Sequence, residues 1–206
     1  MSIRAEQNVD RTEQDKFDAV ASGWWDPEGP FRPLHDLNPA RVRFIAERAA
    51  IDGASVVDVG CGGGILAEAL ARKGGQVTGI DVAPRTLAIA KLHLHESGLQ
   101  VDYREVTIED LAQEAAGSFD IVTCMEVLEH VPDPASIVKG VCDLLKPAGH
   151  AFFSTLNRTP LAFVLGIVGA EHIARLLPRG THRYDRFIRP SELSAWIRTA
   201  GLQLQE

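Results

Sequence analysis

A glycine-rich segment and a single aspartate carry the residue types that hold a nucleoside ligand. Residues 55–59 have the apolar composition of a buried parallel strand, and Gly60 begins the stretch 60–64, in which four glycines let the backbone turn tightly and approach a ligand. Asp81 stands 21 residues after Gly60, at the end of the next apolar run. A carboxylate at that place can accept hydrogen bonds from both hydroxyls of a ribose. Gly60 and Asp81 are therefore predicted ligand-binding residues.

The spacing of the glycines argues against a dinucleotide. A G-x-G-x-x-G pattern counted from Gly60 requires a small residue at position 65, where this chain has Ile65. The spacing present, G-x-G-G-G, suits a ligand with no phosphate to place at the helix N-terminus. The segment therefore favours S-adenosylmethionine over NAD(P). An ordinary strand-to-helix turn is the alternative for a glycine loop alone, and Asp81 at the strand end disfavours it.

A second segment with chemically useful side chains lies at residues 118–131. Its apolar start predicts another buried strand ending near Cys124, so residues 125–130 should lie at the carboxyl edge of the sheet, where open α/β sheets bind ligands. Met125 stands first at this edge, and its polarisable, unbranched thioether can lie flat on an adenine ring. Met125 is therefore a predicted cofactor-binding residue.

Three titratable side chains follow Met125. Glu126, Glu129 and His130 offer two carboxylates and an imidazole, which serve general acid–base chemistry and are also normal ligands of a divalent cation. Glu129 and His130 are the catalytic candidates, and all three are candidate ligands of Mg²⁺. The alternative is that Glu129 and His130 only cap or orient the loop after the strand.

The elements that must position these groups alternate along the chain. Strands are predicted at residues 55–59, 76–80, 100–105, 119–124 and 150–155. Helices are predicted at residues 65–73, 84–96, 134–145 and 190–199. This order is typical of a doubly wound α/β sheet. The alternating residues after Gly201 predict a further strand that the chain does not complete, so we expect the last strands to be cut off.

Residues 1–50 precede the first strand and are predicted to form an N-terminal helical cap on a core of residues 51–206. Residues 10–13 and 12–15 both match the capping-box pattern, which predicts a helix leading into two adjacent tryptophans.

A second helix of this cap is predicted to start at Asn38, because an N-cap residue followed by Pro39 is a helix-start signal. This start places Arg41 in the first turn, with Val42 and Ile45 on the buried side. Arg41 is therefore predicted to reach the ligand while its helix stays packed. A solvated surface charge is the alternative.

Composition limits the classes of protein to which this chain can belong. Its 206 residues are enough to bury roughly 70% of the unfolded surface in one core, and its formal net charge of −7 argues against a general nucleic-acid binder. The three cysteines lack C-x-x-C spacing and are expected to be reduced thiols in a cytosolic protein. The N-terminus has no signal-peptide pattern, and the longest apolar run, residues 161–170, is about half of a bilayer span. We therefore expect no membrane-spanning segment.

Residues 158–189 combine that apolar run with a local excess of positive charge. Against one glutamate and one aspartate stand six arginines, namely Arg158, Arg175, Arg179, Arg183, Arg186 and Arg189. Such an insertion is predicted to lie on an anionic membrane surface without spanning it. A core-packed lid with solvated arginines is the alternative. We therefore expect a cytoplasmic protein that associates peripherally with the inner face of the cytoplasmic membrane.

Together these segments resemble class I S-adenosylmethionine-dependent methyltransferases. The segments that carry the likeness are residues 58–64, 79–81, 124–134 and 145–149. A narrower likeness, to the ubiquinone-biosynthesis O-methyltransferases, rests on residues 17–26, 33–35, 38–41, 153–158 and 180–182. It extends from about Asn8 to the last residue. The Trp-Trp-Asp of residues 24–26 and the Ser-Thr-Leu-Asn-Arg of residues 154–158 are specific to that group.

The resemblance implies a Rossmann-like fold with a mostly parallel, seven-stranded sheet and an N-terminal helical lid. It implies methylation of ring hydroxyls in 2-polyprenyl-6-hydroxyphenol and 3-demethylubiquinol, with S-adenosylmethionine as the donor. The family's cofactor residues fall on Arg41, Gly60, Asp81 and Met125. In the related mitochondrial enzymes a magnesium ion is associated with positions that match Glu126, Glu129 and His130 here. Other ubiquinone-biosynthesis proteins are possible partners.

A phenolic acceptor needs help to lose its proton. A free phenol with a pKa of about 10 is only ~0.1% ionised at pH 7, so forming the phenolate costs roughly 4 kcal/mol. A base with a pKa near 7, or a cation that stabilises the oxyanion, offsets that cost. His130 is the leading candidate for the base, followed by His182 and Glu129.

Other classes of function remain as alternatives. A nucleic-acid methyltransferase is disfavoured by the acidity of the chain and by Cys124-Met-Glu-Val, where base-amino methylases usually carry Asn or Asp followed by Pro-Pro and an aromatic residue. An NAD(P) oxidoreductase is disfavoured by Ile65. Another small-molecule methyltransferase, or a non-catalytic cofactor-binding scaffold in a biosynthetic complex, would require an activity assay to exclude.

Overall fold

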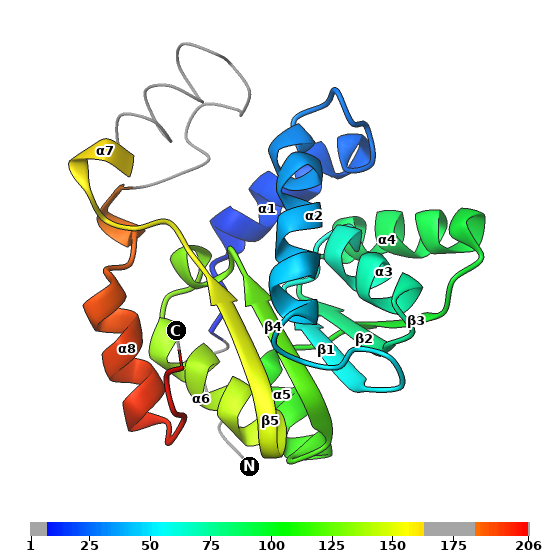
Figure 1. The fold of residues 1–206 in the computed structure, drawn as a ribbon. Coiled ribbons are helices and arrows are strands. Elements are labelled where there is room, and N and C mark those ends of the chain that lie inside the picture. Colours follow the sequence, from blue (N-terminus) through cyan, green and yellow to red (C-terminus); the bar gives the residue numbers. More distant parts are fainter. Residues whose placement is uncertain (1–7, 163–183, 206) are drawn as a thin grey trace, which may run out of the picture.

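The structure is a computed structural model that describes residues 8–162 and 184–205. Within them, five parallel strands form one sheet in the order β3-β2-β1-β4-β5 (Figure 1). The strands are β1 Ser55–Val59, β2 Gln76–Asp81, β3 Val101–Glu105, β4 Phe119–Met125 and β5 Leu145–Ser154. The chain runs outward from β1 to β3 and then crosses to β4, so the strand order reverses between β1 and β4. Open α/β sheets bind ligands at such a reversal.

Helices cover both faces of this sheet, which confirms the predicted doubly wound arrangement (Figure 1). One face carries α2 Arg32–Ala46, α3 Ile65–Arg72 and α4 Pro84–Ser97, and the other carries α5 Ile108–Ala115, α6 Pro134–Leu144 and α8 Pro190–Thr199. Successive residues of a strand point their side chains to opposite faces of the sheet. Val56 packs into the cluster beneath α2, α3 and α4, while Val57 packs into the cluster beneath α5, α6 and α8, and both are fully buried.

The register of the central strands brings the predicted cofactor residues to one edge of the sheet. Val59, the last residue of β1, pairs with Ile80 of β2 on one side and with Cys124 of β4 on the other. Each of these three paired residues is followed in the chain by a predicted ligand residue, namely Gly60, Asp81 and Met125. Parallel pairing therefore brings together three residues that are far apart in the sequence.

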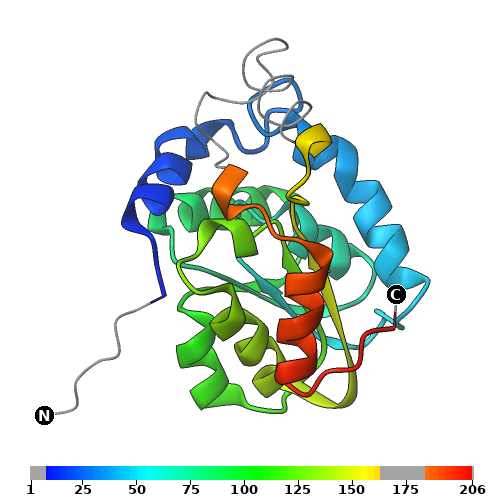
Figure 2. The ribbon, with the colours of Figure 1, turned by 90° about the vertical axis from the view of Figure 1, so that its left-hand side faces the viewer.

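The N-terminal helices lie beyond the carboxyl ends of the strands (Figures 1 and 2). They are α1 Arg11–Val20, the short 3₁₀ helix η1 Ala21–Gly23 and the first part of α2. The Asp10 carboxylate caps α1 by accepting hydrogen bonds from the Thr12 and Glu13 amides at 3.0 and 3.3 Å, as the pattern at residues 10–13 predicts. Whether residues 1–50 form a separate unit stays a prediction.

The predicted start of the second cap helix was wrong. Helix α2 begins at Arg32 with Pro33 in its first turn, so Pro39 lies inside the helix and Arg41 lies beyond its first turn. Leu34 packs beside the stacked rings of Trp24 and Phe31, and this contact stabilises the earlier start. Tertiary packing thus outweighs the local helix-start signal.

The described residues contain the five strands above and not the seven that the resemblance implied. Residues 202–205 belong to no strand, and Leu202 packs instead against the apolar cluster beneath α8. The other short elements in the part of the chain that the structure describes are η2 Leu128–His130, α7 Pro160–Ala162 and η4 Tyr184–Arg186. Among the described helices, none is long and apolar enough to cross a membrane.

Candidate functional site

The glycine segment after β1 forms the floor of the site. Gly60 and Gly62 have φ angles of +66° and +54°, in the left-handed region that side chains other than glycine avoid. A Cβ at Gly60 would overlap the Val127 side chain, and a Cβ at Gly62 would overlap the Trp24 ring. Glycine is therefore required here by the turn and by the packing of Val127 and Trp24, while close approach of this backbone to a ligand stays a prediction.

Asp81 ends β2 beside this floor, as predicted. Its carboxylate accepts one hydrogen bond from the Gly62 amide and one from the Ala83 amide, each at 2.9 Å. Burial raises the pKa of Asp81, and the hydrogen bonds from the two amides oppose that shift. Each carboxylate oxygen accepts more than one hydrogen bond, so Asp81 keeps acceptor capacity for a ligand while it ties β2 to the glycine turn.

Asp58 is a site residue that the sequence reasoning missed. It is the last residue but one of β1, is 3% exposed, and accepts a hydrogen bond of 2.7 Å from the Thr123 hydroxyl of the neighbouring strand. Burial raises the pKa of Asp58 to about 7, with Thr123 and Arg41 acting against the shift and Asp81 and Glu126 adding to it. The sequence did contain a signal for this residue. Asp58 is an acidic residue between two valines of a strand that was predicted to be fully buried.

Arg41 reaches the site from α2. Its guanidinium forms an ion pair with Glu126, and its side chain is only 9% exposed, so the interpretation of Arg41 as a solvated surface charge is wrong. The Glu126 carboxylate also accepts a hydrogen bond of 2.5 Å from Ser154. Burial raises the pKa of Glu126, while Arg41, Ser154 and His130 lower it and Glu129 raises it further.

Met125 and Glu126 form the turn where β4 ends. Ser154 of the neighbouring β5 places its hydroxyl 3.0 Å from the Met125 sulfur. Glu126 has a φ of +53°, which costs a non-glycine residue on the order of 1 kcal/mol and is found most often at functional sites.

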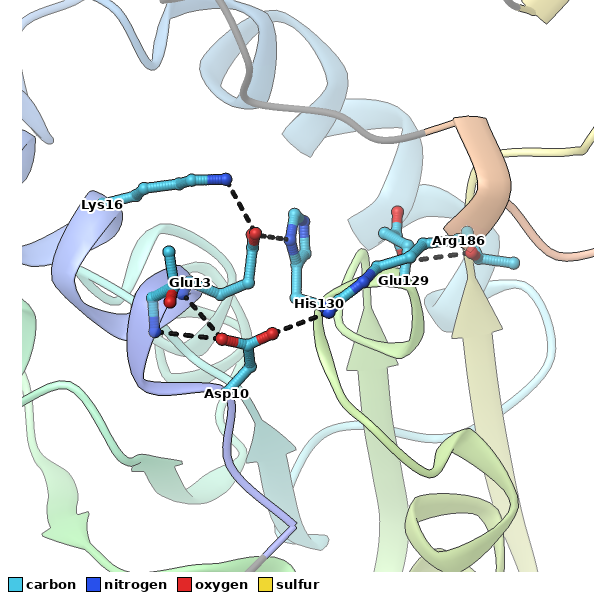
Figure 3. Close-up of polar contacts among 8 residues, drawn as sticks. Asp10, Glu13, Lys16, Glu129, His130 and Arg186 are labelled. Atoms are coloured by element: carbon cyan, nitrogen blue, oxygen red, sulfur yellow. Dashed lines mark hydrogen bonds and ion pairs between the residues drawn. The ribbon is translucent and has the colours of Figure 1, made fainter.

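Glu129 and His130 occupy η2, directly after this turn. Glu129 is 4% exposed and accepts a hydrogen bond of 2.9 Å from Thr155, while its Oε1 is buried without a hydrogen-bond partner among the described residues. His130 places its Nδ1 2.9 Å from a carboxylate oxygen of Glu13 in α1 (Figure 3). Glu13 was predicted only as part of a helix cap, and no local signal pointed to this contact. His182 lies outside the described residues.

The three predicted metal ligands are each held by protein groups. Glu126 pairs with Arg41, Glu129 with Thr155, and His130 with Glu13, although Thr155 and Glu13 were not part of the prediction. Within residues 8–162 and 184–205, no three His, Cys, Asp or Glu side chains are arranged to hold a metal ion. The described side chains thus show no assembled set of Mg²⁺ ligands, and the metal site stays a prediction through which we derive no step.

Of the predicted site residues that the structure describes, all except Glu129 line one cavity of about 430 Å³ at the reversal point of the sheet. Its floor contains Asp58, Gly60, Asp81 and Met125. Its walls are largely apolar and include Phe17, Trp24, Phe31 and Leu34 from the N-terminal helices. The cavity thus joins a polar floor suited to a nucleoside with aromatic walls suited to an apolar ring.

Comparison with known sequences places this chain among methyltransferases. A family model described as a methyltransferase domain matches residues 32–206. The ubiquinone biosynthesis O-methyltransferase of Xanthomonas campestris pv. campestris is 62% identical over 199 residues, which cover 97% of this chain and 83% of that protein. The enzyme of the same name from Xanthomonas oryzae pv. oryzae is 58% identical over 202 residues, which cover 98% of this chain and 84% of that protein.

Solved structures share the fold. The crystal structure of magnesium protoporphyrin IX methyltransferase from Synechocystis PCC 6803, which contains bound SAH, is 20% identical with a TM-score of 0.73, covering 96% of this chain and 91% of that one. A putative methyltransferase from Bacillus halodurans is 26% identical with a TM-score of 0.63, covering 81% of this chain and 69% of that one. The Rossmann-like arrangement of the sheet is thus confirmed.

Proposed function

This chain belongs to the family of ubiquinone biosynthesis O-methyltransferases, and from that premise we propose that it methylates ring hydroxyls of 2-polyprenyl-6-hydroxyphenol and of 3-demethylubiquinol. It is an S-adenosylmethionine-dependent O-methyltransferase that acts on a quinone precursor. The observation that carries the finer proposal is the shared cavity, in which the strand ends with Gly60, Asp81 and Met125 meet His130 and an aromatic wall.

Four residues are proposed to hold the cofactor. The Asp81 carboxylate accepts hydrogen bonds from the ribose hydroxyls, Gly60 leaves room for the amino-acid part, and Met125 packs on the adenine. Arg41 binds the cofactor carboxylate. In support of this role, the Arg41 Nε is buried without a hydrogen-bond partner among the described residues, so the guanidinium keeps a donor besides the one used by Glu126.

S-adenosylmethionine supplies, when bound, a methyl group activated on a sulfonium. The protein aligns the acceptor hydroxyl, excludes water and removes the hydroxyl proton. His130 is proposed as the base, because it lines the cavity next to the predicted cofactor residues. Glu129 was the second candidate; its Oε1 keeps acceptor capacity, but Glu129 does not line the cavity, which disfavours it as the base.

Replacing Asp81 with alanine should weaken the binding of S-adenosylhomocysteine at least tenfold, about 1.4 kcal/mol, because a buried charged acceptor is removed. The loss also frees the Gly62 amide and so loosens the glycine turn. Titration calorimetry measures the effect. The matched control is Asp102→Ala, an exposed carboxylate on the neighbouring strand β3. Equal affinity of Asp81→Ala and the wild-type protein would remove Asp81 from the cofactor site.

Two other functions remain to be separated from this proposal. A methyltransferase acting on a different small molecule would form S-adenosylhomocysteine with another acceptor but not with a demethylubiquinol analogue. A non-catalytic scaffold would bind the cofactor and form no product with any acceptor. An assay that follows S-adenosylhomocysteine with a short-chain demethylubiquinol therefore distinguishes all three.

We propose further that residues 158–189 dock on an anionic membrane surface on the cytoplasmic side and receive the polyprenyl tail. The support is the coincidence of an apolar run with several arginines in a chain that is acidic as a whole. Two of the six arginines are already paired within the protein, Arg158 with Glu192 and Arg186 with Asp10. Residues 163–183, with Arg175, Arg179 and Arg183, lie outside the described residues. Other ubiquinone-biosynthesis proteins are proposed partners at the same surface.

Liposome flotation tests this membrane proposal. Binding should require phosphatidylglycerol or cardiolipin and weaken in high salt, because each arginine near such a surface contributes about 1 kcal/mol and salt screens the attraction. The triple change of Arg175, Arg179 and Arg183 to glutamate should abolish flotation. The matched control reverses three exposed charges elsewhere, Arg43, Lys91 and Lys139, by the same amount. Equal flotation with neutral vesicles would contradict docking on anionic lipids and favour the alternative, in which residues 158–189 form a packed lid.

A further inference from the structure

Trp25 follows the 3₁₀ helix η1 and holds the glycine turn, although its ring lies outside the lining of the cavity. The indole Nε1–H donates a hydrogen bond of 2.9 Å to the Gly63 carbonyl. The same ring stacks on the imidazole of His93 in α4, with 3.4 Å between the ring centroids and 6° between the planes. His35 of α2 meets the indole edge-on at 5.7 Å between centroids. Trp25 is therefore held by rings from two helices while it fixes one carbonyl of the turn.

His93 is itself held by a buried carboxylate. Its Nδ1 lies 2.8 Å from Oε1 of Glu68, a residue of α3 that is 0% exposed, and the other Glu68 oxygen lies 3.7 Å from the Arg72 guanidinium. Glu68 belongs to the first turn of α3, the helix that follows the glycine turn directly, and α4 lies beside α3 on the same face of the sheet (Figure 1). Because a buried carboxylate that lacked a partner would be costly, this contact fixes the orientation of the imidazole.

These contacts form a closed path around the glycine turn. The path runs from the Gly63 carbonyl through Trp25, His93 and Glu68 and returns along α3 to the turn. The peptide bond after Gly63 is also held at its N–H, which donates to the Cys61 carbonyl at 2.9 Å. Four glycines in five residues would otherwise leave this backbone with much conformational freedom to lose when it binds a ligand. The side chains of the protein therefore order the turn.

We propose that Trp25 and His93 are positioning residues for the cofactor, which raise its affinity by keeping the glycine turn ordered before the cofactor binds. The inference rests on the proposed cofactor site at residues 60–64 and Asp81. A preorganised site binds more tightly because less ordering remains to be done on binding. Asp81 holds the turn from β2, and Trp25 holds it from the N-terminal helices. Since neither positioning residue acts on the methyl acceptor, both should affect cofactor binding and leave the chemical step unchanged.

Trp25→Phe tests the hydrogen bond, because phenylalanine keeps a flat ring for His93 and removes the N–H donor. The affinity for S-adenosylhomocysteine, measured by titration calorimetry, should fall about three- to tenfold, the usual effect of one hydrogen bond. The KM for S-adenosylmethionine should rise by the same factor, while kcat at saturating cofactor stays within about twofold. The matched control is Trp196→Phe, at a partly buried tryptophan of α8, which should leave the affinity unchanged.

His93→Gln tests the stacking. Glutamine keeps a donor for Glu68, so the buried carboxylate retains a partner, but it offers no aromatic face to Trp25. Hydrogen exchange of the Trp25 indole N–H, followed by ¹⁵N NMR and assigned with Trp25→Phe, should become faster, while exchange of the Trp196 indole stays the same. The affinity for S-adenosylhomocysteine should fall about two- to fivefold, less than in Trp25→Phe, because the hydrogen bond is loosened and not removed. The matched control is His95→Gln, at an exposed histidine of the same helix.

The double variant separates one shared path from two independent effects. If His93 acts through Trp25, the affinity of the double variant should equal that of Trp25→Phe. The proposal is overturned if the two losses multiply, if Trp25→Phe binds the cofactor normally, or if His93→Gln leaves the exchange of the Trp25 indole unchanged. Asp81→Ala then shows how far such a failure extends. Weaker binding by Asp81→Ala would keep the cofactor site and remove only the positioning role, whereas normal binding would remove the site as well.

Discussion

Replacing His130 should lower kcat by about 100- to 10,000-fold, the range that general base catalysis contributes in enzymes. The physical reason is that only ~0.1% of a phenol is ionised at pH 7. Without a base, nearly every bound acceptor therefore carries a protonated, poorly nucleophilic oxygen. His130→Gln is the sharper variant, because a glutamine can still donate to Glu13 while it cannot take up the proton. Cofactor affinity should remain within about twofold, since His130 lies outside the proposed cofactor set.

Single-turnover kinetics with a short-chain demethylubiquinol measures this change without interference from product release. The matched control is His95→Ala, an exposed histidine on α4. A parallel assay with a chelator separates a base from a metal-assisted mechanism, because a metal-dependent enzyme would lose activity with His130 intact. A variant at position 130 that keeps the wild-type kcat would remove His130 from the mechanism.

Replacing Asp58 with asparagine should stabilise the cofactor-free protein at pH 8 by about 2 to 4 kcal/mol. The pKa of Asp58 in the folded protein is about 7 against a usual value of 3.8, so the folded state binds this proton more tightly than the unfolded chain. The free energy of unfolding therefore falls as the pH rises from about 4 to about 7, and the full cost is present above pH 7. The asparagine side chain carries no charge and avoids that cost, while its oxygen still accepts from Thr123.

Urea unfolding at pH 8 and at pH 4 measures the effect, because at the lower pH Asp58 is neutral in the folded protein, as the asparagine is. The stabilisation should be large at pH 8 and small at pH 4. Asp102→Asn, an exposed carboxylate of the same sheet, should give no comparable gain. If Asp58→Asn is no more stable than the wild type at pH 8, burial does not penalise the Asp58 charge.

We also expect Asp58→Asn to bind the cofactor more weakly, because a cationic ligand relieves the cost of this buried anion.

Much of the site was predictable from local sequence. Apolar runs placed four of the five strands to within one residue, because burial of a parallel strand leaves a continuous apolar segment. The fifth strand begins at Leu145, five residues before its predicted start, because residues 145–149 lack such a run. The glycines at residues 60–64 and the carboxylate of Asp81 were recognisable, because a tight turn and a strand end each impose local requirements on residue type. Because the strands are parallel and adjacent, their carboxyl ends lie at one edge of the sheet, and Gly60, Asp81 and Met125 lie together there.

The rest was decided by contacts between residues distant in the sequence. Glu13 and His130 are 117 positions apart, and nothing in the capping box around Glu13 indicates that its carboxylate binds an imidazole. The start of α2 at Arg32 depended on the packing of Leu34 against the Trp24 cluster, which outweighed the signal at Asn38. Hydrophobic periodicity and turn residues reflect only the interactions within a segment of the chain. The charge states and helix starts at this site depend on burial and on partners that only the folded chain supplies.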